Sequence, residues 1–117
     1  MEEAERIDRT AYDPFIFLER GGRGELLLSD HRMVEKCPIF EELEGWLGNG
    51  ADWESVARTV VAEQLPQLRD TVSFDSEAGM FVALGPRAAL QSLATILHAT
   101  FHDESKLRDF LSRSELD

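Results

Sequence analysis

The sequence has a single cysteine, Cys37, among 117 residues, and no apolar stretch approaches the length of a membrane-spanning helix. One cysteine excludes an internal disulfide and cannot supply a cage of thiolates for a structural zinc ion. A membrane helix needs about 18 or more consecutive apolar residues. The acidic start of the chain, Met1 to Glu5, lacks the basic and apolar parts of a signal peptide. These absences predict a cytoplasmic protein that neither spans a membrane nor is exported by that route.

Basic residues are also scarce, because 12 Lys and Arg face 23 Asp and Glu and leave a formal net charge of -11. Nucleic-acid binding rests on cationic side chains that displace counterions from phosphates, and anionic membranes attract basic segments in a similar way. The composition therefore argues against nucleic acid and membranes as partners. It favours rapid, electrostatically steered association with a basic protein.

The chain has the length of one domain, and its 43% hydrophobic content is enough to fill a single core. Residues 1–10 carry several charges around one large apolar side chain, Ile7, so we expect a flexible N-terminal lead-in there. Residues 11–117 contain no linker-like tract and no repeat, which predicts one domain over that range.

Two β-hairpins are predicted from aromatic and branched residues on either side of turn sequences. The first covers residues 12–28 with a glycine-rich connection at 21–24, and the second covers 72–84 with a turn at 76–79. Hairpins form antiparallel pairs, so most of the sheet is expected to be antiparallel. The pattern does not give the order of the strands.

Apolar residues at helical spacing predict helices over 39–47, 52–65 and 86–101, the second of them capped by Asp52. A short final helix is expected after Asp103. Amphipathic helices need an apolar surface to cover, and one face of a sheet provides it. The predicted fold class is therefore α+β, with a mostly antiparallel sheet from two β-hairpins and helices packed on one face.

Two histidines and the cysteine are the residues of catalytic type that stand out. His98 and His102 are four apart on the predicted third helix, which places both imidazoles on one face. The zinc-protease pattern needs a glutamate after the first histidine, where this chain has Ala99, and a third ligand. We therefore favour structural histidines, with a small metal-dependent hydrolase as the alternative. No base can be placed beside Cys37, so a buried, unreactive thiol is expected.

Acidic residues cluster between Glu35 and Glu54, where Lys36 is the only base. Such a run is often no more than a solvated face. The alternative is a recognition surface, in which carboxylates steer a basic partner while an aromatic side chain serves as the buried anchor. Trp46 is the expected anchor, because Trp53 falls on the apolar stripe of its helix and is expected in the core.

Three segments, at 48–57, 74–81 and 112–117, occur in an order and spacing that resemble the immunity protein 51 family of bacterial polymorphic-toxin systems. The three motifs together are more specific than any one of them, and the resemblance covers residues 48–117. The residues that carry it are Gly48, Asn49, Gly50, Asp52, Trp53, Phe74, Asp75, Glu77, Ala78, Gly79, Met80, Phe81, Glu115, Leu116 and Asp117.

The resemblance implies a small cytoplasmic α+β protein without catalytic activity or cofactor. Such a protein binds a cognate protein toxin and protects the cell that produces it. The negative charge of this chain adds the expectation that the toxin domain is basic. An accessory subunit that is acidic only for solubility is a further alternative, and the oligomeric state is not predicted. The candidate toxin-binding residues are Glu41, Glu42, Glu44, Trp46, Asp52, Glu54, Asp75 and Glu77.

Overall fold

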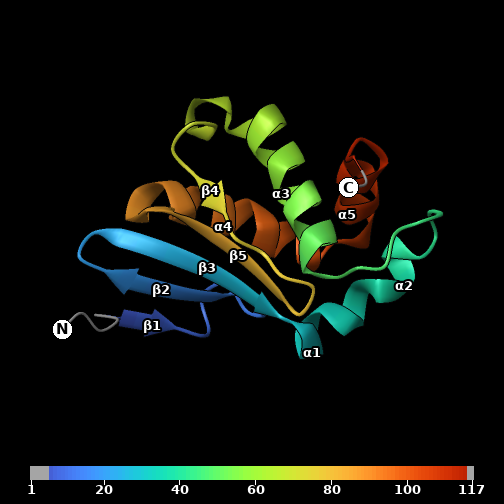
Figure 1. The fold of residues 1–117 in the computed structure, drawn as a ribbon, viewed down its shortest axis with the longest axis horizontal. Coiled ribbons are helices and arrows are strands. Elements are labelled where there is room, and N and C mark those ends of the chain that lie inside the picture. Colours follow the sequence, from blue (N-terminus) through green and yellow to red (C-terminus); the bar gives the residue numbers. More distant parts are fainter. Residues whose placement is uncertain (1–5, 116–117) are drawn as a thin grey trace.

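The fold is a five-stranded antiparallel sheet with helices packed on one face, which confirms the predicted α+β class (Figure 1). It is seen in a computed structural model that describes residues 6–115. The strand order is β1-β2-β3-β5-β4, so the two hairpins join through β3 and β5 at the centre of the sheet. The strands are β1 (Arg6–Asp8), β2 (Ile16–Arg20), β3 (Arg23–Ser29), β4 (Ser73–Phe74) and β5 (Met80–Pro86).

The sheet is amphipathic because side chains alternate between its two faces. Leu26 and Leu28 of β3 are buried, and the register places them opposite Ala83 and Phe81 of β5, which are also buried. The buried positions of neighbouring strands therefore form one continuous surface. Helices α3 and α4 lie on that surface (Figure 1).

The long helices follow the predicted apolar periodicity and its breaks. Helix α3 ends before Pro66, α4 starts directly after Pro86, and the Asp103 carboxylate caps α5 by accepting from two backbone N–H groups. Within residues 6–115, no helix has the length and apolar content needed to cross a membrane. The helices are α1 (Asp30–Met33), the 3-10 helix η1 (Val34–Lys36), α2 (Cys37–Phe40), α3 (Gly50–Gln64), the 3-10 helix η2 (Pro66–Leu68), α4 (Arg87–Phe101) and α5 (Glu104–Ser112).

The helix predicted over 39–47 is shorter than expected and ends at Phe40. The chain then turns, and Gly45 and Gly48 both have positive φ angles, of 90° and 85°. Glycine adopts this left-handed conformation without steric cost, so the two glycines reverse the backbone where the apolar spacing predicted a continuing helix. The segment 41–49 is therefore a loop between α2 and α3.

The cap of α3 also differs from the prediction. Asn49, not Asp52, is the N-cap, and its side-chain oxygen accepts from the Asp52 N–H at 2.9 Å. The Asp52 carboxylate lies in the first turn and reaches back to accept from the N–H groups of Leu47 and Gly48, at 2.7 and 2.8 Å. The acid thus holds the end of the 41–49 loop against the start of the helix.

The N-terminal lead-in expected over 1–10 contains strand β1, which pairs with β2 over Arg6–Asp8. The Asp8 carboxylate accepts from the N–H groups of Ala11 and Thr10, both at 2.9 Å, and these bonds lower its pKa. This turn directs the chain from β1 toward β2. Residues 1–5 lie outside the described part of the chain.

Aromatic side chains form the centre of the core. Trp53 is one of them, as its place on the apolar stripe of 52–65 predicted. The Trp53 ring is fully buried and stacks on Phe101 of α4, with ring centroids 5.8 Å apart. Phe15 meets it edge-on at 6.0 Å, and Phe40 lies 5.3 Å away. The core thus joins α2, α3 and α4 to the segment before β2.

Candidate functional site

Two of the three family-like segments meet where the start of α3 packs on the β4–β5 turn. The Gly50 N–H donates to the Ala78 carbonyl at 3.0 Å. A Cβ on Gly50 would lie 1.9 Å from the Glu77 carbonyl oxygen, so only glycine fits this contact. The contact brings 48–52 and 77–79 together, and it is architectural.

The other family-like residues have similar structural settings. Phe74 is half-buried, packs on Phe81 in the core, and lies under the Arg58 guanidinium at 4.9 Å. Met80 pairs with Ser29 at the end of the sheet. Glu115 is exposed, and Leu116 and Asp117 lie outside the described residues.

The structure contradicts the prediction that the Trp46 side chain is exposed at the surface, where a partner could bury it. Its side chain is only 7% exposed and packs on Phe40, with ring centroids 6.2 Å apart. The reversal at Gly45 and Gly48 turns the indole inward and leaves its neighbour Leu47 60% exposed. Sequence reasoning missed Leu47 because it stands on the stripe of a helix that does not form.

Asp52 is not available at the surface, because it is buried and its carboxylate accepts hydrogen bonds from the loop backbone.

The carboxylates of two other candidates are paired with arginine side chains. Glu42 accepts two hydrogen bonds from Arg108, at 2.9 and 2.8 Å, which lower the pKa of Glu42. Glu54 accepts from Arg58 at 2.6 Å and from the Ser76 N–H at 3.4 Å.

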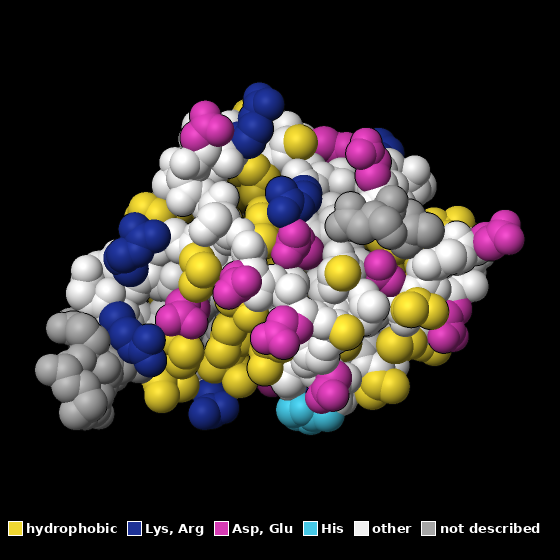
Figure 2. All heavy atoms as spheres, in the orientation of Figure 1, with side chains coloured by type: hydrophobic (Ala, Val, Ile, Leu, Met, Phe, Trp, Pro, Cys, Tyr) yellow, Lys and Arg dark blue, Asp and Glu magenta, His cyan; other side chains and the backbone are white. Residues whose placement is uncertain are grey.

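Four of the candidate carboxylates stay exposed, namely those of Glu41, Glu44, Asp75 and Glu77, and none forms an ion pair within residues 6–115. The 41–49 loop carries the first two and the β4–β5 turn the others. Figure 2 shows Asp and Glu side chains spread over the face that includes the sheet and the α1–α2 end. The exposed, unpaired carboxylates of the predicted acidic surface therefore lie on two neighbouring segments, the 41–49 loop and the β4–β5 turn.

Cys37 is half-buried beside this surface. Burial raises the pKa of the thiol, and the carboxylates of Glu41 and Asp52 raise it further. A thiol in such surroundings stays protonated at neutral pH and is a poor nucleophile. The side chain is therefore less buried than the sequence predicted, and its surroundings disfavour the thiolate.

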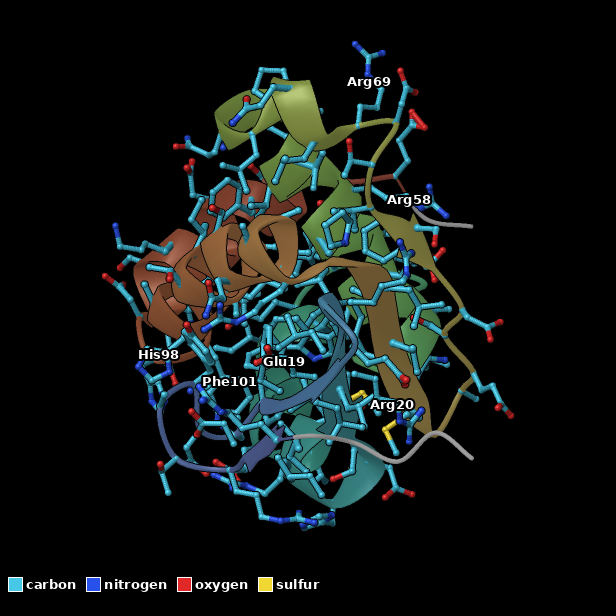
Figure 3. All side chains as sticks on the ribbon, turned by 90° about the vertical axis from the view of Figure 1, so that its left-hand side faces the viewer. Glu19, Arg20, Arg58, Arg69, His98 and Phe101 are labelled. Atoms are coloured by element: carbon cyan, nitrogen blue, oxygen red, sulfur yellow. The ribbon has the colours of Figure 1, made fainter. Side chains whose placement is uncertain are left out.

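The two histidines bind one backbone atom. His98 Nδ1 lies 3.0 Å and His102 Nε2 lies 2.7 Å from the Asp13 carbonyl oxygen, and a carbonyl only accepts, so each nitrogen donates. Figure 3 shows His98 at the periphery of α4. Within residues 6–115, no group of three or more His, Cys, Asp or Glu side chains is placed to hold a metal ion. The pair attaches the segment before β2 to α4.

A further carboxylate cluster lies at the C-terminal end. Arg113 donates to Glu63 of α3 at 2.7 and 2.8 Å, and to Asp109 of α5 at 2.7 and 3.1 Å. These bonds lower the pKa of both carboxyl groups below their ordinary values of 4.5 and 3.8, and they raise the pKa of Arg113. The cluster joins two helices at the surface.

This cluster predicts a pH-dependent part of the stability. A lowered carboxyl pKa stabilises the fold above the ordinary value, and that stabilisation is lost as the pH falls through the lowered pKa. Arg113→Met should therefore have a slightly lower Tm than the parent protein at pH 7, and the difference should begin to shrink as the pH falls to the ordinary carboxyl range, about pH 4, and vanish only below the lowered pKa values of Glu63 and Asp109. Thermal melts across this range measure it. A difference that is the same at every pH would contradict the assignment.

Comparison with known proteins gives one family. The family model described as immunity protein 51 matches residues 15–116, which adds the first hairpin to the segments that carry the resemblance. No curated protein and no solved structure matches the chain.

Proposed function

The chain belongs to the immunity protein 51 family, and we propose that it binds a cognate bacterial toxin and neutralises it without catalysis, protecting the cell that produces both. The family match over residues 15–116 carries this proposal. Protection is proposed to take place in the cytoplasm, through occlusion of the toxin domain by the protein surface.

The charge of the chain supports a basic toxin domain. A net charge of -11 attracts a basic protein over a distance set by the salt concentration. The exposed carboxylates of Glu41, Glu44, Asp75 and Glu77 have no internal cation to neutralise them within the described residues, so they are available to a partner. A nuclease domain, whose substrate phosphates these carboxylates would imitate, fits this chemistry.

The test is co-expression with a candidate toxin domain taken from a neighbouring reading frame. Cells that produce the toxin alone should die, and cells that also produce this chain should survive. With purified proteins, the association rate constant should fall roughly tenfold or more as salt rises from about 0.01 M to about 0.15 M, because steering is screened.

An unrelated acidic protein of similar size is the control, and it should give no protection. Equal death with and without this chain would reject the proposed function. An association rate that ignores salt, together with survival, would reject steering by charge and leave neutralisation standing.

A further inference from the structure

We infer that the toxin docks on a shallow hollow between the α1–η1 segment and the 41–49 loop, where a basic segment of the toxin inserts an aliphatic or aromatic side chain. The hollow measures about 230 Å³. This inference rests on the proposed function and names the surface that performs it. We call this surface the Val34–Leu47 patch; it is lined by Asp30, Met33, Val34, Cys37, Leu47 and Ala78, among others.

Exposed apolar side chains border the hollow. Val34 and Leu47 are each 60% exposed, more than any other large apolar side chain of the described residues, and both border the same hollow. Apolar side chains gathered around a concavity are typical of the anchoring part of a protein interface. In Figure 2 hydrophobic side chains lie among Asp and Glu side chains at the lower right, the region of α1 and α2 in Figure 1.

Negatively charged side chains lie around the hollow. Asp30 borders it, Glu77 precedes Ala78, and Glu41 lies close enough to raise the pKa of the bordering Cys37. None of these three carboxylates forms an ion pair within the part of the chain that the structure describes.

The nearby cations do not neutralise these carboxylates. Arg32 binds Asp13 and Glu35, and Lys36 is largely buried against Phe101 and Glu104. An apolar centre with uncompensated negative charge around it is complementary to an apolar side chain flanked by lysine or arginine.

A basic protein fits this patch better than a second copy of the chain does. A second copy would bring the same net charge of -11 and the same carboxylates against themselves. Arg23 and Arg69, which form no ion pair within residues 6–115, lie at the β2–β3 turn and after η2, and Figure 1 shows both places away from α1. These two arginines therefore do not complement the patch in a symmetric dimer.

The outer face of the sheet is the competing surface. A hollow there is bordered by Leu18 and Leu84, but also by Arg20, Arg23 and Glu25. Arg20 already pairs with Glu25 at 3.3 Å, so that hollow has mixed and partly neutralised charge. It lacks the single sign of charge that a basic partner requires.

The test compares matched surface variants for binding to the purified toxin domain used in the co-expression experiment. Val34→Ser combined with Leu47→Ser should raise the Kd by roughly 30-fold or more, as expected for an interface anchor. Glu41→Lys combined with Glu77→Lys should slow association roughly tenfold at low salt. Both double variants should keep the parent Tm within a few degrees, because the four side chains are exposed.

Two controls make the same chemical changes elsewhere. Ile7→Ser removes an apolar side chain that is 51% exposed on β1, and Asp70→Lys reverses an exposed charge after η2; both should leave the Kd within about threefold. If the parent protein binds and Val34→Ser/Leu47→Ser binds equally well, the docking surface is wrong and the proposed function stands. If the parent does not bind, the proposed function fails first. A patch variant that dissociates a dimer of the parent protein would instead identify the patch as a self-interface.

Discussion

Gly50→Ala is expected to lower the free energy of unfolding by at least about 3 kcal/mol. The added Cβ would lie 1.9 Å from the Glu77 carbonyl oxygen and 2.7 Å from that of Met80. Both obstacles are backbone atoms, which cannot rotate away as a side chain can. Alanine is favoured over glycine in helices by at most about 1 kcal/mol. The clash outweighs this preference, so the substitution lowers the free energy of unfolding. Urea unfolding followed by circular dichroism measures the loss.

Gly79→Ala is the matched control in the same contact region. A Cβ there would meet only a carboxylate oxygen of Asp30 at 3.8 Å, which is ordinary contact. Its free energy of unfolding should change by less than about 1 kcal/mol. If Gly50→Ala unfolds at the urea concentration of the parent protein, the start of α3 does not pack on the β4–β5 turn as described.

Trp53→Ala is expected to cost about 3–5 kcal/mol, because it removes the ring at the centre of the aromatic core. The Trp53 Nε1–H has no hydrogen-bond partner within the described residues. Trp53→Phe therefore gives up no hydrogen bond and should cost less than about 2 kcal/mol, mainly through lost volume. Denaturant midpoints and the near-ultraviolet circular dichroism of both variants test this order.

An exposed residue provides the comparison. Leu43→Ala truncates a side chain that is 40% exposed in the 41–49 loop and should change the stability by less than about 1 kcal/mol. Equal losses for Trp53→Ala and Trp53→Phe would indicate that the indole N–H is bonded after all. A Trp53→Ala loss as small as that of Leu43→Ala would remove Trp53 from the core.

The elements with strong periodicity were predictable from the sequence. The apolar stripe from Trp53 to Leu65 and the proline after it define α3, and the turn chemistry at 76–79 defines the second hairpin. The order of strands was not predictable, because the pairing of β3 with β5 joins residues between 51 (Ser29 and Met80) and 63 (Arg23 and Pro86) positions apart. Local propensity contains no information about such a pairing.

The candidate site was predicted only in part. Its acidic character followed from composition, whereas Trp46, which was assigned as its apolar anchor, is buried, and the most exposed apolar side chains of this region are Val34 and Leu47. The positive φ angles of Gly45 and Gly48 decide which side of the 41–49 loop faces the core. The spacing of apolar residues in a single sequence does not reveal these backbone angles. The need for glycine at position 50 became visible only with the β4–β5 turn beside it.

The shared position of the β4–β5 turn affects how any genetic screen for lost protection should be interpreted. The Ala78 carbonyl accepts from the Gly50 N–H, and Ala78 also borders the Val34–Leu47 patch, so one short segment holds the fold together and lies at the proposed docking surface. Substitutions next to this segment will give toxin-sensitive colonies either because the protein unfolds or because the proposed docking surface is changed. Under the proposed function, only those mutants whose melting curves match that of the parent protein would identify contacts with a toxin.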